Sequence, residues 1–208
     1  MQILKSAWAE CRRDSKYIIC FFGVSILKLI AVLFSNFLVL WLTSFADEGL
    51  ITEARSKELY QRLILTSVAF SILLAPLFGS ISDRLPSRIV IPVAFTIRGI
   101  CGYSFLFMDN PESLFSIVFI VVLIVSTLLE GISLEVLFLR GLPSQIRGTM
   151  IGVYSFFGHI GILLFLLVGG QMFDKIGKNS PFVFLAIMDT IVVLVALIMV
   201  CMGKLKSG

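Results

Sequence analysis

The sequence has little charge and lacks the motifs that catalysis or metal binding requires. Only 14% of its 208 residues are charged, and there is a single histidine. Its four cysteines are dispersed, with no Cys-x-x-Cys pair, and neither His-Glu-x-x-His nor a Gly-x-Ser-Gly motif occurs. We therefore expect no enzyme activity, no metal site and no cofactor. The 17 basic residues are scattered and form no stripe, which argues against nucleic-acid binding.

Long apolar runs take the place of these features. Hydrophobic residues make up 58% of the chain, and the mean hydropathy is +1.04. A hydrocarbon core about 30 Å thick requires roughly 20 helical residues to cross it. Six runs approach that length: 18–45, 63–81, 89–108, 114–139, 150–173 and 181–202. The sequence predicts an all-α, polytopic membrane protein, with residues 1–208 forming a single six-helix bundle in contact with the lipid bilayer.

The basic residues in the loops predict how the chain is oriented. If the amino terminus is cytoplasmic, ten basic residues fall on the cytoplasmic side and five on the other. This difference favours both termini in the cytoplasm, with the first run as a signal anchor, but it does not identify the membrane. Segment 46–61 is the longest loop that we expect; it carries four acidic residues and has room for a short surface helix.

A short motif recurs in the two halves of the chain. Gly79 and Asp83 end the second apolar run, and Gly170 and Asp174 end the fifth, 91 residues later. That offset corresponds to three helices, and three is odd, so the two triplets would have opposite orientations in the membrane. We expect two inverted repeats, approximately 18–108 and 114–202, as in many secondary transporters.

The segment around the first copy of this motif resembles a known signature. Gly79, Asp83, Arg84 and Arg88 match the cytoplasmic loop pattern G-x-x-x-D-R-x-G-R-[KR] of the major facilitator superfamily, although Pro86 and Ser87 depart from it. The glycine-rich fifth run also resembles that family's penultimate helix. The resemblance covers essentially the whole chain, as the carboxy-terminal six-helix half of such a transporter.

This resemblance implies a function and a partner. The family moves small solutes by alternating access between two six-helix bundles, so it implies a second bundle or self-association. It also implies that Gly79, Asp83, Arg84 and Arg88 form a loop that stabilises one conformational state. An ordinary loop whose arginines only fix membrane orientation is the alternative. A structural or accessory subunit that transports nothing is the alternative for the whole chain.

Polar residues inside the apolar runs are candidate functional residues, because ionisable groups at membrane depth are costly. Lys28 lies near the middle of the first run, with Asn36 further along it, and Glu130 lies in the fourth run. The resemblance places the first and fourth helices beside a central cavity, so we expect these three residues to contact the solute or couple its transport. We also expect a Lys28–Glu130 ion pair, either as a switch or as a static packing element. Snorkelling of these side chains to the edge of the lipid is the third alternative.

The remaining polar residues receive other interpretations. Arg98 and Asp189 lie in runs that the resemblance places outside the cavity, and we expect buried pairing with neighbouring polar groups there rather than contact with the solute. His159 is a candidate proton relay, although hydrogen-bonded packing is the commoner role of such a histidine. The glycines of the fifth run predict close helix packing; they are Gly148, Gly152, Gly158 and Gly161. The sequence does not identify the solute or the coupling ion.

Overall fold

The chain folds into an elongated bundle of membrane-length helices. A computed structural model describes Cys11, Asp14 and residues 16–203. The first span consists of α2 (Lys16–Val32), a π-helical segment η1 (Leu33–Phe37) and α3 (Leu38–Asp47). The others are α4 (Glu53–Arg84), α5 (Ser87–Ser104) with the 3-10 turn η2 (Phe105–Phe107), α6 (Leu114–Leu139), α7 (Arg147–Lys175) and α8 (Ser180–Cys201). All six are long and apolar enough to cross a membrane, which confirms the predicted all-α class.

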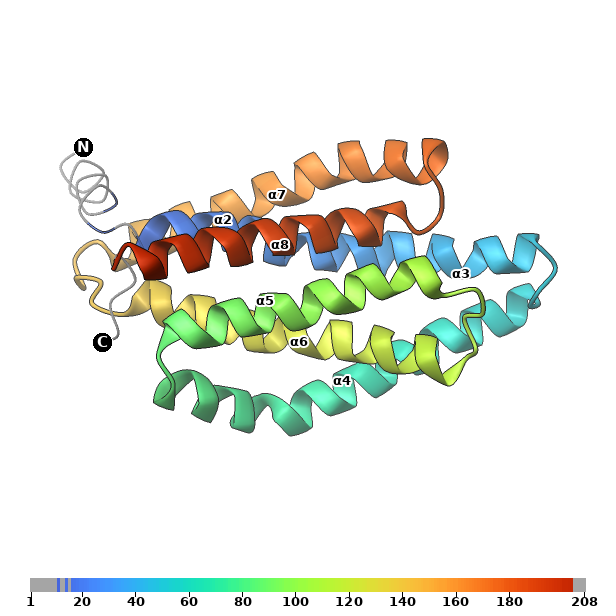
Figure 1. Cartoon of the computed structure of the whole chain (residues 1–208), viewed down its shortest axis with the longest axis horizontal. Helices are drawn as coiled ribbons and strands as arrows, with labels where there is room; N and C mark the ends of the chain where they lie inside the picture. Colours follow the sequence, from blue (N-terminus) through green and yellow to red (C-terminus); the bar gives the residue numbers. More distant parts are fainter. Residues whose placement is uncertain (1–10, 12–13, 15, 204–208) are drawn as a thin grey trace.

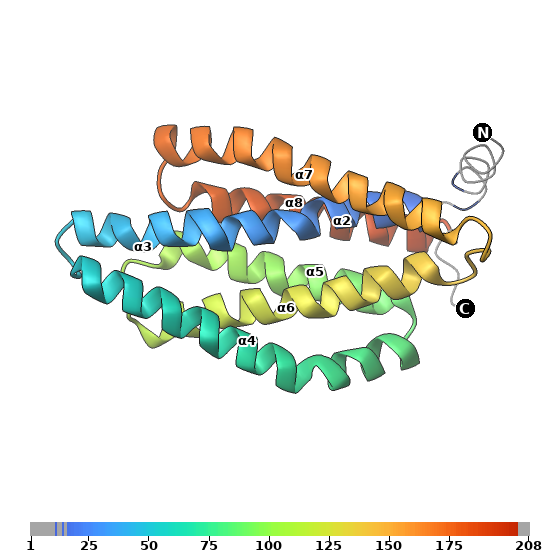
Figure 2. The same cartoon turned by 180° about the vertical axis from the view of Figure 1, so that it is seen from behind.

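The helices run along the long axis of the bundle, and α2 begins at the end where α8 finishes (Figure 1, Figure 2). The main packing pairs are α5 with α8, α2 with α7, and α4 with α6. A shift of 91 residues carries the first span onto α6, α4 onto α7 and α5 onto α8. The α2–α7 pair thus corresponds to the α6–α4 pair, as expected of two inverted triplets. The limits of the two units, 18–108 and 114–202, stay a prediction.

Aromatic clusters close the core near both ends of the bundle. At one end Phe105 stacks on Phe182 with ring centroids 3.8 Å apart, and Trp41 packs edge-on against both. The indole of Trp41 donates a 2.7 Å hydrogen bond to Asn179. At the other end Phe138 lies between Tyr17 and Tyr154. These rings tie the first span to the α7–α8 loop at one end and to α6 and α7 at the other.

The start of the second span differs from the sequence prediction. Helix α4 begins at Glu53 rather than residue 63, so most of the predicted 46–61 loop is helical and only a short turn remains. The Thr52 side chain caps this helix by accepting the Arg55 N–H at 3.3 Å. Glu58 then pairs with Arg55 and Arg62 at helical spacings of three and four residues. Such pairs stabilise a polar helical turn that hydropathy alone does not detect.

The glycines of α7 divide into two groups. A Cβ added at Gly161 would lie 2.2 Å from the carbonyl oxygen of Ser25, so α2 approaches α7 closely at this point. Gly158 is similarly buried against α2. Gly148 and Gly152 have no atom within 4 Å of an added Cβ. The packing prediction therefore holds for Gly158 and Gly161, but it is wrong for Gly148 and Gly152 within this bundle.

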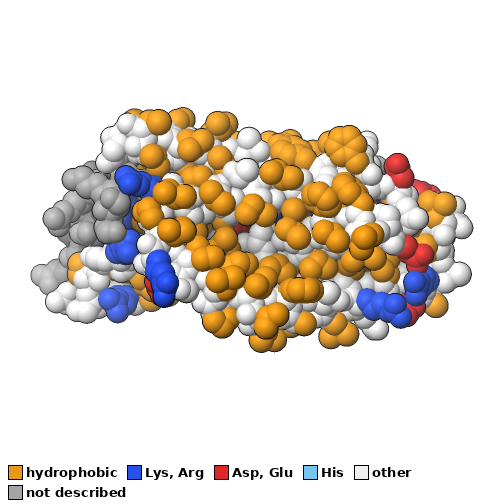
Figure 3. Space-filling view, turned by 60° about the horizontal axis from the view of Figure 1, so that its bottom comes forward, with side chains coloured by type: hydrophobic (Ala, Val, Ile, Leu, Met, Phe, Trp, Pro, Cys, Tyr) orange, Lys and Arg blue, Asp and Glu red, His pale blue; other side chains and the backbone are white. Residues whose placement is uncertain are grey.

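Charge is confined mainly to the two ends of the surface. Figure 3 shows a broad band of apolar side chains between charged residues at either end. Such a band is expected of a protein whose helices contact lipid hydrocarbon. Together with the six spans, it shows an integral membrane protein in contact with the bilayer.

Candidate functional site

A polar strip runs along one face of the first span. Lys28 in α2 and Ser35 and Asn36 in η1 are all exposed, although they lie between apolar segments of the same helix. Lys28 is twelve residues from the start of α2, or about 18 Å along a helix that rises 1.5 Å per residue. Asn36 is about 12 Å further along. Within the described part of the chain all three side chains stay exposed, so the strip faces outward.

The part of the strip that contains Ser35 and Asn36 is π-helical. The Leu38 N–H donates to the Leu33 carbonyl five residues earlier, rather than to the residue four earlier. The wider turn changes the direction of the side chains in this segment, and the Ser35 hydroxyl donates to the Val32 carbonyl at 3.4 Å. Single π-turns inside α-helices occur frequently at functional sites. The sequence analysis selected Asn36 but did not predict the π-turn around it.

Lys28 lies at the boundary between α2 and α7. Its Cγ atom is 2.9 Å from the position that a Cβ on residue 158 would take, so Gly158 provides space for the stem of the lysine. Near this point the Ser25 hydroxyl donates to the Phe157 carbonyl at 3.0 Å. Among the described residues, Lys28 has no ion pair, and the predicted Lys28–Glu130 pair does not form. Glu130 instead pairs with Arg98 in the interior of the bundle.

Three charged side chains meet in that interior. Arg98 of α5 forms ion pairs with Glu130 of α6 and with Asp189 of α8, and all three side chains are fully buried. Arg98 Nε also donates to Asp189 Oδ2 at 2.9 Å, so the Arg98–Asp189 contact is bidentate. Arg98 and Asp189 are thus buried with polar partners, as expected, and the structure identifies those partners as each other and Glu130. We call Arg98, Glu130 and Asp189 the charge triad.

The charge triad is electrostatically unbalanced. It contains one guanidinium and two carboxyl groups, so it would have a net charge of −1 if all three were ionised. Glu130 is near enough to Arg98 for an ion pair, but in the described part of the chain neither Glu130 oxygen has an aligned hydrogen-bond partner. A proton on Glu130 would bring the group to zero net charge.

His159 lies on α7, next to Gly158. Its side chain is exposed, and Nδ1 donates to the Ser155 carbonyl one helical turn earlier at 2.7 Å. This bond leaves Nε2 facing outward. The structure records no contact between the imidazole and the charge triad. A role for His159 as a proton relay stays a prediction.

The loop between α4 and α5 carries the signature residues. Asp83 and Arg84 end α4, Arg88 lies in the first turn of α5, and all three side chains are exposed. Over residues 16–203, no ion pair involves any of them, so the predicted bonds across this loop are absent. Gly79 has open space around it. These residues are free to contact another molecule, but their gating role is untested.

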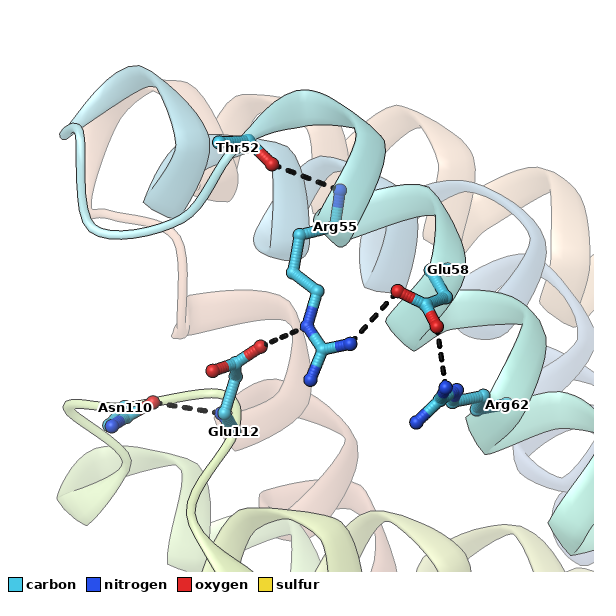
Figure 4. A network of polar contacts seen from close by, with 6 residues as sticks. All are labelled: Thr52, Arg55, Glu58, Arg62, Asn110 and Glu112. Carbon is cyan, nitrogen blue, oxygen red and sulfur yellow. Dashed lines mark hydrogen bonds and ion pairs between the residues drawn. The ribbon is translucent and has the colours of Figure 1, made fainter.

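The opposite end of the bundle has an alternating network of acids and bases (Figure 4). Arg55 of α4 pairs with Glu112 in the loop before α6 and with Glu58 on its own helix. Glu58 also pairs with Arg62. At the same end, Lys178 in the α7–α8 loop pairs with Glu48, and its ammonium lies 3.6 Å from the ring centroid of Phe45. These contacts connect α4 to α6, and α3 to the α7–α8 loop.

The described residues offer no group of three His, Cys, Asp or Glu side chains that could hold a metal ion. The charge triad is a mixed-charge cluster, in which the Arg98 guanidinium occupies the position that a cation would take.

Comparison with known proteins identifies distant relatives. The chain is 25% identical over 191 residues to magnetosome protein MamH of Paramagnetospirillum magneticum, covering 90% of this chain and 44% of MamH. It is 24% identical over 197 residues to magnetosome protein MamZ of the same organism and of Magnetospirillum gryphiswaldense, covering 93% of this chain and 30% of MamZ. The chain therefore spans less than half the length of these curated relatives.

These comparisons correct the family assignment. No family model matches the sequence, and no solved structure matches it either. The proteins found are magnetosome proteins, so the expectation of a carboxy-terminal half of a major facilitator transporter is wrong. That resemblance depended mainly on four positions, Gly79, Asp83, Arg84 and Arg88, in a motif that Pro86 and Ser87 interrupt. Four matches in a basic membrane loop are too few to define a family.

Proposed function

We propose that this chain is one bundle of a secondary transporter, which moves a small solute across a membrane together with a second bundle. The observation that carries this proposal is the exposed polar strip formed by Lys28, Ser35 and Asn36. A charged side chain facing hydrocarbon near mid-membrane costs a few kcal/mol on insertion scales. A strip of such residues is far less costly if it lines a water-filled path. The second bundle would cover the other side of that path.

The lengths of the relatives support a second bundle. MamH and MamZ are each more than twice as long as the segment that this chain matches, so they have room for another set of helices. Because the chain spans only part of them, the second bundle is either another polypeptide, another copy of this chain, or a further segment of a longer protein.

Lys28 and the π-turn support the solute contact. An ammonium group with no acidic partner among the described residues favours an anionic or polar solute. In the π-turn, the altered bonding between Leu33 and Leu38 provides a point at which the first span can bend. A bend there would move Asn36 relative to Lys28. Such a movement is required if the solute path opens alternately to each side of the membrane.

The charge triad supports proton coupling. Glu130 is buried, contacts Arg98 and has two oxygens without aligned hydrogen-bond partners in the described residues. Binding and release of one proton would switch the triad between net charges of 0 and −1. In the low-dielectric interior, such a change alters how strongly α5, α6 and α8 hold together. The proton is therefore the coupling ion that we propose.

The basic end of the bundle supports the orientation that we propose. Lys16, Arg84, Arg88, Arg140 and Arg147 lie at the end where α2 begins and α8 finishes. By the positive-inside rule, this end faces the cytoplasm.

The test is to purify the assembly at native expression, determine its mass, and reconstitute it in liposomes that contain a pH-sensitive dye. Citrate, inorganic phosphate and sorbitol serve as anionic and neutral probes. We expect an assembly larger than one chain, together with anion-dependent proton movement that Lys28→Ala and Glu130→Gln both reduce more than tenfold. Lys57→Ala, at an exposed position on α4, is the control.

A stable lone monomer without flux would contradict the proposal and favour an accessory subunit. If flux occurs and neither variant alters it, the path is assigned to the wrong residues.

A further inference from the structure

A long apolar groove lies between α4 and α6, on other helices than the polar strip. Its volume is about 500 Å³, and its walls include Phe70 and Phe78 of α4 and Val122 of α6, with Ile97 of α5 contributing to its lining. Of its twelve lining residues, only Thr66 and Ser126 carry a polar side chain. The groove follows α4 from Thr66 to Phe78, or about 18 Å at 1.5 Å per residue. One leaflet of the hydrocarbon core is about 15 Å thick, so the groove has the length of a single acyl chain.

A second, polar cavity continues this groove toward the membrane surface. Its volume is about 250 Å³, and it shares Thr66 and Ile117 with the groove. Arg55, Arg62 and Glu112 are the charged residues that line it. Together the two cavities form one feature, with an apolar body inside the bilayer and a charged mouth at its edge. We call this feature the α4–α6 groove.

Charges of both signs alternate around the mouth. In Figure 4, Glu112, Arg55, Glu58 and Arg62 form a chain of ion pairs, with Arg55 Nη1 donating to Glu58 at 2.9 Å. Arg55, Arg62 and Glu112 line the mouth itself. Glu58 lies outside the lining but bonds to both arginines, so this chain of four charged groups has no net charge. Arg62 uses only Nη2 in its pair with Glu58, which leaves its other N–H groups available for a phosphate oxygen. Glu112 contacts Arg55 through Oε1 and has its second oxygen available for an ammonium group.

We propose that the α4–α6 groove binds a zwitterionic phospholipid. One acyl chain fills the apolar body, the phosphate bonds to Arg62, and the headgroup ammonium lies beside Glu112. The mixed charge of the mouth explains the preference, because Glu112 lines it beside the two arginines and would repel an anionic headgroup but attract an ammonium group. A soluble ligand would have to reach the groove through the bilayer, whereas lipid already surrounds it. The proposal does not depend on transport.

The test is native mass spectrometry of the purified chain after equilibration with dioleoylphosphatidylcholine or dioleoylphosphatidylglycerol, which have identical acyl chains. We expect the zwitterionic lipid to be retained preferentially, as a single tightly bound copy. Arg62→Gln should reduce its retention about tenfold, since glutamine cannot form the charge-assisted hydrogen bond to the phosphate. Val122→Trp should reduce it at least as much, because the indole would fill the groove. Lys57→Gln, on the same helix but outside the groove, is the matched control.

Three results would overturn the proposal. The first is equal or stronger retention of the glycerol lipid, which would indicate general attraction of anions to arginine. The second is unchanged retention in Val122→Trp, which would place the bound lipid elsewhere. The third is a dimer cross-linked through Val122→Cys, which would assign the groove to a second copy of the chain. Both Arg62 and Val122 are exposed, so these substitutions are compatible with folding, and unchanged thermal unfolding verifies it.

Discussion

Arg98 joins three helices in the interior of the bundle. It holds two carboxyl groups from two other helices, and all three side chains are fully buried. Removing one partner of a buried ion pair costs about 3–5 kcal/mol, because the remaining charge is left without compensation. At position 98 the loss would leave two carboxyl groups close together without their cation.

We therefore expect Arg98→Ala to destabilise the bundle by about 3–5 kcal/mol in equilibrium unfolding from detergent micelles. Glu130→Gln should cost much less, since the amide keeps the shape of the side chain and Arg98 retains its bidentate contact with Asp189. Glu135→Gln is the control, because Glu135 lies on the same helix but is exposed. Equal unfolding free energies of Arg98→Ala and Glu135→Gln would show that the charge triad does not stabilise the bundle.

The relation between Arg98 and Asp189 was available from the sequence. They are 91 residues apart, the same offset that relates Gly79 to Gly170, so they occupy equivalent positions in the two triplets. An inverted repeat brings equivalent residues together when their helices meet at the symmetry axis, as α5 and α8 do. Glu130 could not be assigned in this way, because its pairing depends on how far α6 is rotated toward α5. The sequence was equally consistent with Lys28 as the partner of Glu130.

At the scale of single helices, α7 shows how glycines set the distance between elements. Gly161 permits α7 to approach the backbone of α2 at Ser25, whereas Gly148 on the same helix has open space around it. Both residues belong to a regular helix, so the glycine itself costs about the same at each position. Only the neighbouring helix distinguishes them.

We expect Gly161→Ala to destabilise the bundle by about 1–3 kcal/mol, because its methyl group would overlap the Ser25 carbonyl and force α2 and α7 apart. Gly148→Ala should be neutral or slightly stabilising, since alanine favours helix by up to about 1 kcal/mol. Thermal unfolding of the two variants in the same detergent provides the comparison. Equal effects would show that α2 and α7 do not approach as closely as described.

Helix bounds were predictable where hydropathy alone determines them. The fourth span was predicted as 114–139, and α6 has those bounds. The start of α4 was missed because side-chain pairs and the Thr52 cap form its first turns, rather than apolar residues. The π-turn was missed because Leu33–Phe37 has no composition that distinguishes it from α-helix. Within this π-turn Phe37 packs against Gly169 and Phe165 of α7, which are distant in the sequence.

At the scale of the whole molecule, the polar strip and the α4–α6 groove have different chemistry. The strip with Lys28, Ser35 and Asn36 is polar at membrane depth, whereas the α4–α6 groove is apolar in its body and charged only at its mouth. The groove suits lipid, but the strip does not. This difference is the main physical reason for expecting a second bundle on the side of the strip.

Water access to this strip tests the central proposal most directly. Ala31 is exposed between Lys28 and Ser35, so a cysteine at this position reports the environment of the strip. In a background without the four native cysteines, Ala31→Cys in native membranes is treated with a small, charged thiol reagent. Leu194→Cys, on an exposed apolar part of α8, is the lipid-facing control.

The proposal predicts that Ala31→Cys reacts at least tenfold faster than Leu194→Cys. Equal, slow reaction of both would place the strip against lipid and contradict a solute path along the first span.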